Sequence, residues 1–204
     1  MKIIPLYSNN HRSNTYLVVS GNKCSIIDPG QTFEIIEKAI SEYNLIPVSV
    51  ILTHGHFDHI YSLDKIREKF NIPAYIHEND KKMPTDALKN AYHVFFNDYF
   101  TQKSAENTFV AGDHIPIGDE FLIVIHTPGH TKGSSCLLGS SFLITGDTLF
   151  ADSIGRTDMY SGNPSEMYTS LSLIKNINPS KDITIFPGHG RSENLAYALD
   201  NVIY

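Results

Sequence analysis

The chain has 204 residues, of which 41% are hydrophobic and 19% charged, a composition typical of globular rather than disordered proteins. Its net charge is −6, so the chain lacks the excess of positive charge that is typical of nucleic-acid-binding proteins. The N-terminal residues lack the features of a signal peptide, and no apolar stretch is long enough to span a bilayer. We therefore expect one cytoplasmic domain over 1–204 that acts on a small molecule, and the composition leaves its oligomeric state open. Cys24 and Cys136 are interpreted as buried thiols of a reducing compartment.

The first half of the chain alternates between strand and helix patterns. Two β-rich runs, 15–21 and 23–30, are separated by a glycine-asparagine turn and predict a hairpin. Apolar residues at helical spacing then predict a helix over 32–44. The next three predicted elements are a buried strand over 48–53, a helix over 62–70 and a strand over 73–77.

Residues 81–112 have no clear hydrophobic period, and their role stays open. The aromatic-rich stretch 84–113 is interpreted as a helix followed by a loop. The strand and helix patterns then resume along the chain. They predict three strands over 120–130, 134–140 and 141–147, a helix over 164–177, a strand over 182–190 and a closing helix over 192–203.

Three imidazoles and a carboxylate are crowded into the stretch "ILTHGHFDHI", directly behind the predicted strand over 48–53. They are His54, His56, Asp58 and His59. A single histidine is usually a surface or core residue, but each buried imidazole needs a hydrogen-bond partner, so four such groups together need another explanation. Imidazole and carboxylate ligands suit zinc or iron.

Three further candidate ligands follow later apolar runs, where the backbone turns at a glycine. His130 ends "HTPGH", Asp147 ends "ITGD", and His189 lies in "FPGHG". A catalytic zinc takes about three protein ligands and keeps one position open for water. Seven ligands therefore suit two metals about 3.5–4 Å apart that share a bridging group.

The motifs "THGHFDH", "TPGHTKGSS", "TGDTLF" and "FPGHG", in this order, resemble the metallo-β-lactamase superfamily and, within it, the glyoxalase II-like hydrolases (hydroxyacylglutathione hydrolases). The resemblance covers nearly the whole chain. It implies an α/β (α+β) fold, a four-layer αββα sandwich with the metals at one edge. It also implies that His54, His56 and His130 hold the first metal, that Asp58, His59 and His189 hold the second, and that Asp147 bridges both.

The resemblance implies two divalent metal ions, with zinc the first choice and iron or manganese as alternatives. A bridging hydroxide would attack a carbonyl carbon, and Asp58 would hold and orient the proton of this nucleophile. A thiolate leaves without a protein acid, which favours a thioester such as a hydroxyacyl-glutathione. The bridging carboxylate is a feature that separates glyoxalase II-like enzymes and lactonases from the true β-lactamases, so we do not expect antibiotic hydrolysis.

Two other enzymes of the superfamily are alternatives to a thioester hydrolase. One is an iron-dependent persulfide dioxygenase and the other is a lactonase-type hydrolase. The dioxygenases hold one iron with two histidines and an aspartate, whereas the seven-ligand set predicts two metals. Metal content would therefore distinguish a dioxygenase from the hydrolases.

Two residues near the motifs have two interpretations each. Arg156, in "SIGRTDMYSGN", lies near the position where glyoxalase II carries a lysine that helps to hold glutathione; it either binds an anionic part of the substrate or pairs locally with Asp158. Asp28, in "SIIDPG", is interpreted as a turn residue in preference to a carboxylate that orients a ligand histidine. The remaining histidines match no motif and are assigned no role: His11, His77, His93, His114 and His126.

Overall fold

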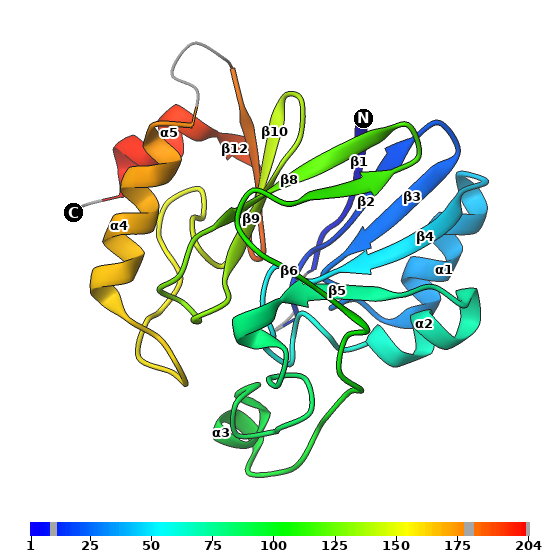
Figure 1. The fold of residues 1–204 in the computed structure, drawn as a ribbon, viewed down its shortest axis with the longest axis horizontal. Helices are drawn as coiled ribbons and strands as arrows, with labels where there is room; N and C mark the ends of the chain where they lie inside the picture. The colour runs from blue at the N-terminus through cyan, green and yellow to red at the C-terminus, as the bar shows by residue number, and fades with distance from the viewer. Residues whose placement is uncertain (9–11, 178–181, 203–204) are drawn as a thin grey trace.

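The computed structural model describes residues 1–8, 12–177 and 182–202. It contains two six-stranded sheets that pack face to face, with helices on their outer faces (Figure 1). The strands of the first sheet, in spatial order, are β1 (Lys2–Leu6), β2 (Thr15–Ser20), β3 (Lys23–Ile27), β4 (Ile46–Ile51), β5 (Ala74–His77) and β6 (Asn107–Phe109). The strands of the second sheet are β12 (Glu193–Asn194), β11 (Thr184–Pro187), β10 (Phe142–Gly146), β9 (Ser135–Leu138), β8 (Glu120–His126) and β7 (His114–Ile117).

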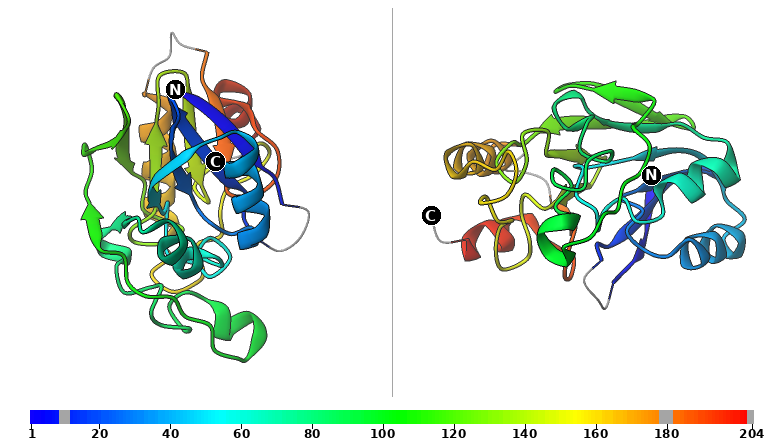
Figure 2. Two further views of the ribbon diagram at one scale, coloured as in Figure 1. Left: turned by 90° about the vertical axis from the view of Figure 1, so that its right-hand side faces the viewer. Right: turned by 90° about the horizontal axis from the view of Figure 1, so that it is seen from below.

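The helices belong to different layers of the molecule. They are α1 (Phe33–Glu42), α2 (Leu63–Phe70), the 3-10 turn η1 (Glu78–Asp80), α3 (Tyr92–Phe96), α4 (Pro164–Lys175) and α5 (Leu195–Asn201). Helices α1 and α2 cover the first sheet, and α4 and α5 cover the second (Figures 1 and 2). The predicted αββα sandwich is therefore confirmed. Short α3 lies outside these layers, at one end of the molecule.

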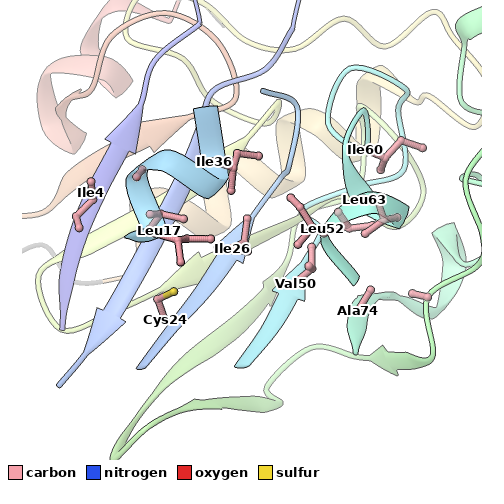
Figure 3. Packing of buried hydrophobic residues seen from close by; sticks show 14 of the residues in the cluster. Ile4, Leu17, Cys24, Ile26, Ile36, Val50, Leu52, Ile60, Leu63 and Ala74 are labelled. Carbon is pink, nitrogen blue, oxygen red and sulfur yellow. The ribbon is translucent and has the colours of Figure 1, made fainter. Parts of the chain in front are cut away.

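Three apolar cores hold the four layers together. Side chains alternate along β2, because successive strand residues point to opposite faces. Leu17 packs in the core under α1 and α2 (Figure 3), whereas Tyr16 and Val18 pack in the core between the sheets. A third core joins the second sheet to α4 and α5. Both cysteines are buried and free, as predicted.

Most predicted elements are present, with ends shifted by a few residues. The structure also contains four short strands that were not predicted from the sequence: β1, β6, β7 and β12. The interpretation of residues 84–113 as a helix followed by a loop was wrong in detail, because the segment contains turns, the five-residue α3, a loop and β6. His11 and the last residue of the predicted closing helix lie outside the described residues.

The pairing of strands places the motifs at one edge of the sandwich. Strands β3 and β4 are parallel and end side by side, with Ile27 opposite Ile51. Strands β10 and β11 are also parallel, with Gly146 opposite Pro187. Because carboxyl ends of parallel strands meet at the same edge of a sheet, the residues that follow them converge. Within the described part of the chain, no helix is both long and apolar enough to cross a membrane.

Candidate metal centre

The first cluster follows strand β4 in a tight turn. His54, His56 and His59 are each at most 4% exposed, so their ring nitrogens are withdrawn from bulk water. The three imidazoles meet edge to face or tilted, with the rings of His54 and His59 only 4.1 Å apart. Buried imidazoles at such spacing need partners for their inward nitrogens.

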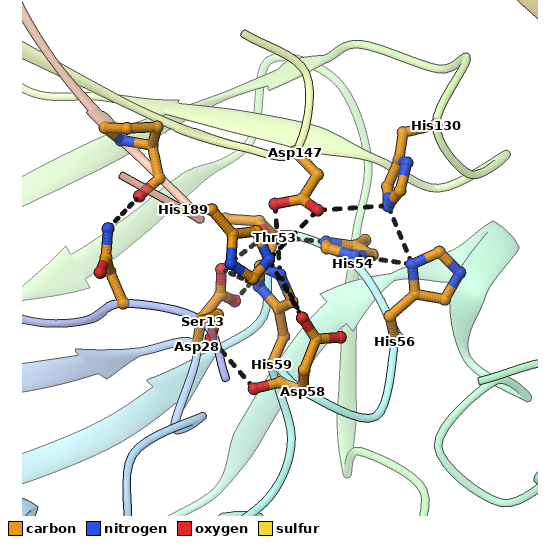
Figure 4. Close-up of polar contacts among 12 residues, drawn as sticks. Ser13, Asp28, Thr53, His54, His56, Asp58, His59, His130, Asp147 and His189 are labelled. Atoms are coloured by element: carbon orange, nitrogen blue, oxygen red, sulfur yellow. Dashed lines mark hydrogen bonds and ion pairs between the residues drawn. The ribbon is translucent and has the colours of Figure 1, made fainter. Parts of the chain in front are cut away.

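His54, His56 and His130 form one group of possible ligands (Figure 4). Nε2 of His54 lies 3.1 Å from Nδ1 of His56, and the same Nδ1 lies 2.9 Å from Nε2 of His130. Ligand atoms around one tetrahedral zinc lie about 3.3 Å apart, because each Zn–N bond is about 2.0–2.1 Å. These three nitrogens therefore have roughly the spacing of ligands to one cation.

Asp58, His59 and His189 form a second group. Nε2 of His189 lies 3.1 Å from Oδ2 of Asp58, and Nε2 of His59 lies 3.7 Å from the same oxygen. The structure thus brings together the two sets of three residues that the family resemblance implies.

Asp147 lies between the two groups, directly after strand β10. Its Oδ1 is 3.2 Å from Nε2 of His59, and its Oδ2 is 3.6 Å from Nε2 of His130 and 3.5 Å from Nε2 of His189. Each carboxylate oxygen has more than one lone pair, so a single aspartate can serve two cations at once. The position of Asp147 is therefore suitable for a bridging ligand.

The chemistry of the donor set fits divalent cations. Among the described buried side-chain atoms that lack a hydrogen-bond partner are Nε2 of His59 and Oδ1 of Asp147, which face each other in this cluster. Buried polar atoms are nearly always satisfied in folded proteins, so such orphans point to a missing partner. A cation that accepts lone pairs from both atoms would satisfy them.

The imidazoles are of two kinds, because the pKa is lowered in some and raised in others. Burial, and then the neighbouring imidazole of His130, lowers the pKa of His56 to about 3, so this ring stays neutral at pH 7. Burial also lowers the pKa of His54 well below its usual value. Burial acts in the same direction on His59 and His189, but Asp147 and Asp58 more than offset it and raise both pKa values. Positive charge is therefore favoured where the carboxylates are, as bound cations would require.

Three of the candidate ligand rings are oriented by hydrogen bonds at their Nδ1 atoms. Nδ1 of His59 donates to Oδ2 of Asp28 at 2.9 Å, and Nδ1 of His130 donates to the carbonyl oxygen of Arg156 at 2.7 Å. Nδ1 of His54 lies 3.2 Å from Oγ1 of Thr53, whose hydroxyl donates to Asp28. A proton held on Nδ1 leaves the Nε2 lone pair for a metal, which is how such partners fix the tautomer of a ligand histidine.

Asp28 corrects one sequence interpretation. It does end strand β3 in a turn, with a positive φ of 48°. Its carboxylate also accepts hydrogen bonds from the backbone and hydroxyl of Thr53 and from His59. The preference for a turn residue alone was therefore wrong, because the same geometry turns the carboxylate toward a ligand histidine.

Asp80, which was not predicted as a site residue, connects the two loops that carry the first group. Its carboxylate is fully buried and accepts from the backbone of Gly55 at 3.3 Å, from the hydroxyl of Thr131 at 2.7 Å and from the backbone of Gly133 at 2.8 Å. Gly55 lies between His54 and His56, and Thr131 follows His130. No sequence signal marks Asp80, because it lies in a 3-10 turn without a motif.

A cavity of about 620 Å³ opens onto this cluster. That volume lies within the usual range for small-molecule sites. Its lining includes five of the seven candidate ligands: His56, Asp58, His130, Asp147 and His189. Arg156 also lines the cavity, and its guanidinium makes a two-pronged pair with Asp158, at 2.7 and 2.8 Å. The local pairing of Arg156 is thus present in the structure.

Comparisons with known proteins point to a single family. The sequence matches the family described as "Metallo-beta-lactamase superfamily" over residues 9–189. It is 36% identical over 181 residues to a probable metallo-hydrolase of Bacillus subtilis, an alignment that covers 88% of this chain and 85% of that protein.

Two solved structures share the fold. The structure described as BLEG-1 B3 metallo-beta-lactamase aligns with a TM-score of 0.90 and 28% identity, and the alignment covers 98% of this chain and 97% of that chain. ETHE1 from Myxococcus xanthus aligns with a TM-score of 0.76 and 25% identity, covering 96% and 80% of the two chains.

Proposed function

The chain belongs to the metallo-beta-lactamase superfamily, and from this premise we propose that it is a metal-dependent hydrolase that cleaves a thioester, with a hydroxyacyl-glutathione as the first candidate. The observation that carries the proposal is the position of Asp147 between two groups of three ligands beside an open cavity. We propose that these seven residues hold two divalent cations, with zinc as the first choice and iron or manganese as alternatives.

Two cations bound there would acidify a water molecule and polarise a substrate carbonyl. The chain itself supplies the orientation of the ligands and a proton acceptor. Burial raises the pKa of Asp58, but His59 and His189 more than offset this effect and lower it overall, so the carboxyl is ionised at neutral pH. Asp58 lines the cavity and can take a proton from the attacking water.

The lining of the cavity favours a thiol as the leaving group. Apart from the candidate ligands, the only ionisable side chain among the described lining residues is Arg156, and a guanidinium does not give up a proton near pH 7. An alkoxide or amine would need a proton donor as it leaves, whereas a thiolate is stable enough to leave unprotonated. Hydrolysis of a thioester to a carboxylic acid and a thiol therefore suits this set of residues.

We further propose that Arg156 binds an anionic part of the substrate, remote from the reacting carbonyl. The Arg156 side chain is 52% exposed, and its guanidinium matches a carboxylate in a two-pronged geometry. A substrate carboxylate would have to displace Asp158, its present partner. Arg156→Ala should raise KM for a glutathione thioester and lower kcat/KM by roughly 10- to 100-fold.

The matched comparison for Arg156→Ala is a neutral thioester, whose kcat/KM should hardly change. Asp158→Asn should have the opposite effect on the glutathione thioester and lower KM, because it releases the guanidinium. Equal losses on both thioesters, or a loss in kcat alone, would show that Arg156 only shapes the loop.

A second candidate function is an iron-dependent persulfide dioxygenase, with which the similarity to ETHE1 is compatible. Elemental analysis by mass spectrometry after gentle purification, followed by assays with thioesters, a persulfide and a β-lactam, tests both candidates. We expect two metals per chain and thioester turnover. One iron per chain together with oxygen-dependent persulfide turnover would favour the dioxygenase.

A further inference from the structure

One wall of the cavity comes from the segment whose sequence has no clear period. Residues 91–99 include α3 and expose several large apolar side chains. Val94 is 66% exposed, Phe95 53%, Phe96 51% and Tyr99 77%. Of these four side chains, Phe95 and Phe96 line the cavity above the metal cluster. Two phenylalanine rings are therefore half-exposed to water beside a reactive site.

The segment is fixed to the loop that carries the ligands. The backbone N–H of Phe57 donates to the carbonyl oxygen of Asn90 at 2.9 Å. Asn90 is fully buried, and its side chain holds both ends of the segment by donating to the carbonyl oxygen of Phe100 at 2.8 Å and accepting from the backbone of Tyr92 at 2.9 Å. The half-exposed rings thus have a defined position relative to the ligands.

Phe57 continues this wall down to the metal cluster. It lies in sequence between His56 and Asp58, which belong to different ligand groups. Its ring centroid is 5.7 Å from that of Phe95 and 5.5 Å from that of Phe96, within the range of favourable aromatic contacts. The three rings form a continuous apolar surface that begins beside the reacting centre, and we name it the aromatic wall.

Arg156 brings a positive charge next to Phe95, away from the candidate ligands on either side of Phe57 in the sequence. The guanidinium carbon of Arg156 lies 5.9 Å from the ring centroid of Phe95. Phe150 and Met159, on the chain that follows Asp147, add further apolar surface to the cavity. A substrate group next to the reacting carbonyl therefore meets aromatic carbon, while an anion farther out meets Arg156.

We propose that the aromatic wall of Phe57, Phe95 and Phe96 is an acyl-binding subsite, and that the substrates are thioesters with an aromatic or bulky apolar acyl group. This inference rests on the proposed thioester hydrolysis, and it replaces the hydroxyacyl group of the first candidate substrate with an apolar acyl group. An apolar acyl group would remove the half-exposed rings from water, and that burial is favourable in proportion to its area. A small or hydroxylated acyl group would leave the rings exposed to water.

The test compares S-phenylacetyl-glutathione with S-acetyl-glutathione, two substrates with the same thiol part. We expect kcat/KM of the metal-loaded protein to be at least 10-fold higher for the phenylacetyl thioester, because filling an apolar pocket with one additional group changes selectivity by roughly 10- to 200-fold. Phe95→Ala and Phe96→Ala should each reduce this selectivity ratio by roughly 10-fold. Val94→Ala and Tyr99→Ala are the matched controls from the same segment, and they should leave the ratio unchanged.

A binding measurement separates failure of the subsite from failure of the proposed hydrolysis. Calorimetry with phenylacetate and acetate needs no turnover, and phenylacetate should bind at least 10-fold more tightly, with the difference lost in Phe95→Ala. If no thioester is cleaved but phenylacetate still binds more tightly than acetate, the proposed hydrolysis is wrong and the aromatic wall is still an apolar binding subsite. If thioesters are cleaved without acyl preference and both acids bind alike, the subsite is wrong. An effect of Val94→Ala equal to that of Phe95→Ala would also overturn it.

Discussion

Replacing Asp147 by asparagine tests the central feature of the candidate metal centre. The amide keeps the shape of the side chain but removes its charge, and it is a poor ligand. In the structure Asp147 approaches three imidazoles from both ligand groups, at 3.2 to 3.6 Å. If it bridges, each cation has four protein ligands, and the substitution removes one of the four from both sites.

The size of the effect follows from this ligand count. Zinc sites with four protein ligands bind with about 10–16 kcal/mol, so one ligand in four contributes about 3 kcal/mol. At about 1.4 kcal/mol per factor of ten, each site should bind its metal roughly 100-fold more weakly. In the proposed mechanism the attacking water needs both cations, so kcat/KM for a thioester should fall at least as far.

The assay for Asp147→Asn is metal content by mass spectrometry at graded free zinc, together with thioester turnover and far-ultraviolet circular dichroism. We expect loss of metal and activity with an unchanged spectrum. Asp152→Asn is a suitable control, because Asp152 is a 57% exposed acid on the same loop, paired with Arg191. Normal turnover and two tightly bound metals in Asp147→Asn would refute the bridging role and leave Asp147 as a turn residue.

Three further substitutions test the surroundings of the centre. Gly188→Ala should reduce metal content per chain, because its new methyl group would clash with Oδ1 of Asp147 and lie 2.7 Å from the ring of His59; full metal content would contradict this. Asp80→Ala should lower the free energy of unfolding, measured in urea, by about 2–4 kcal/mol, since it leaves three donors near the first ligand group unsatisfied. The metal affinity of this variant should also fall, by roughly 10- to 100-fold. Lower stability with unchanged metal affinity would show that Asp80 has a purely structural role. Burial, and then His126, lowers the pKa of His77 from 6.5 to about 4, so the neutral ring contributes stability above pH 6.5 that is lost as the pH falls toward 4. This loss is about 2 kcal/mol at pH 5, and His77→Gln, studied without metal, should show a correspondingly smaller decrease between pH 7 and pH 5.

The residues of the metal centre could be proposed from sequence because their chemistry is local. Each candidate ligand follows a strand. Parallel pairing brings the ends of β3 and β4, and those of β10 and β11, to one edge. Strand β8, which precedes His130, runs in the same direction as β10 because both pair antiparallel with β9. The residues behind the ligands were harder to find. Asp28 and Asp80 act through hydrogen bonds to groups 25 or more positions away, and a single aspartate in a turn gives no sign of such partners.

Two of the four missed strands, β1 and β7, also have a physical explanation. Pro5 lies within β1 and Pro116 within β7, and a proline weakens the sequence pattern of a strand because it has no N–H for the ladder. Both strands lie at the edge of their sheet, where one row of backbone groups needs no strand partner. The sandwich therefore tolerates prolines that would disrupt a central strand.

The aromatic wall could not be predicted because its segment is not held by periodic packing. The segment is positioned by the buried side chain of Asn90 and by one backbone hydrogen bond from Phe57, and neither contact leaves a pattern in the sequence. Substitutions in α3 can therefore change the wall without moving a ligand, since the ligands are fixed by strand ends and by Asp28, Thr53 and Asp80. In the proposed function, the candidate ligands set the reaction class, and α3 contributes two of the three rings that would select the substrate. Relatives that share every ligand need not share a substrate, and residues 91–99 are where the difference should be sought.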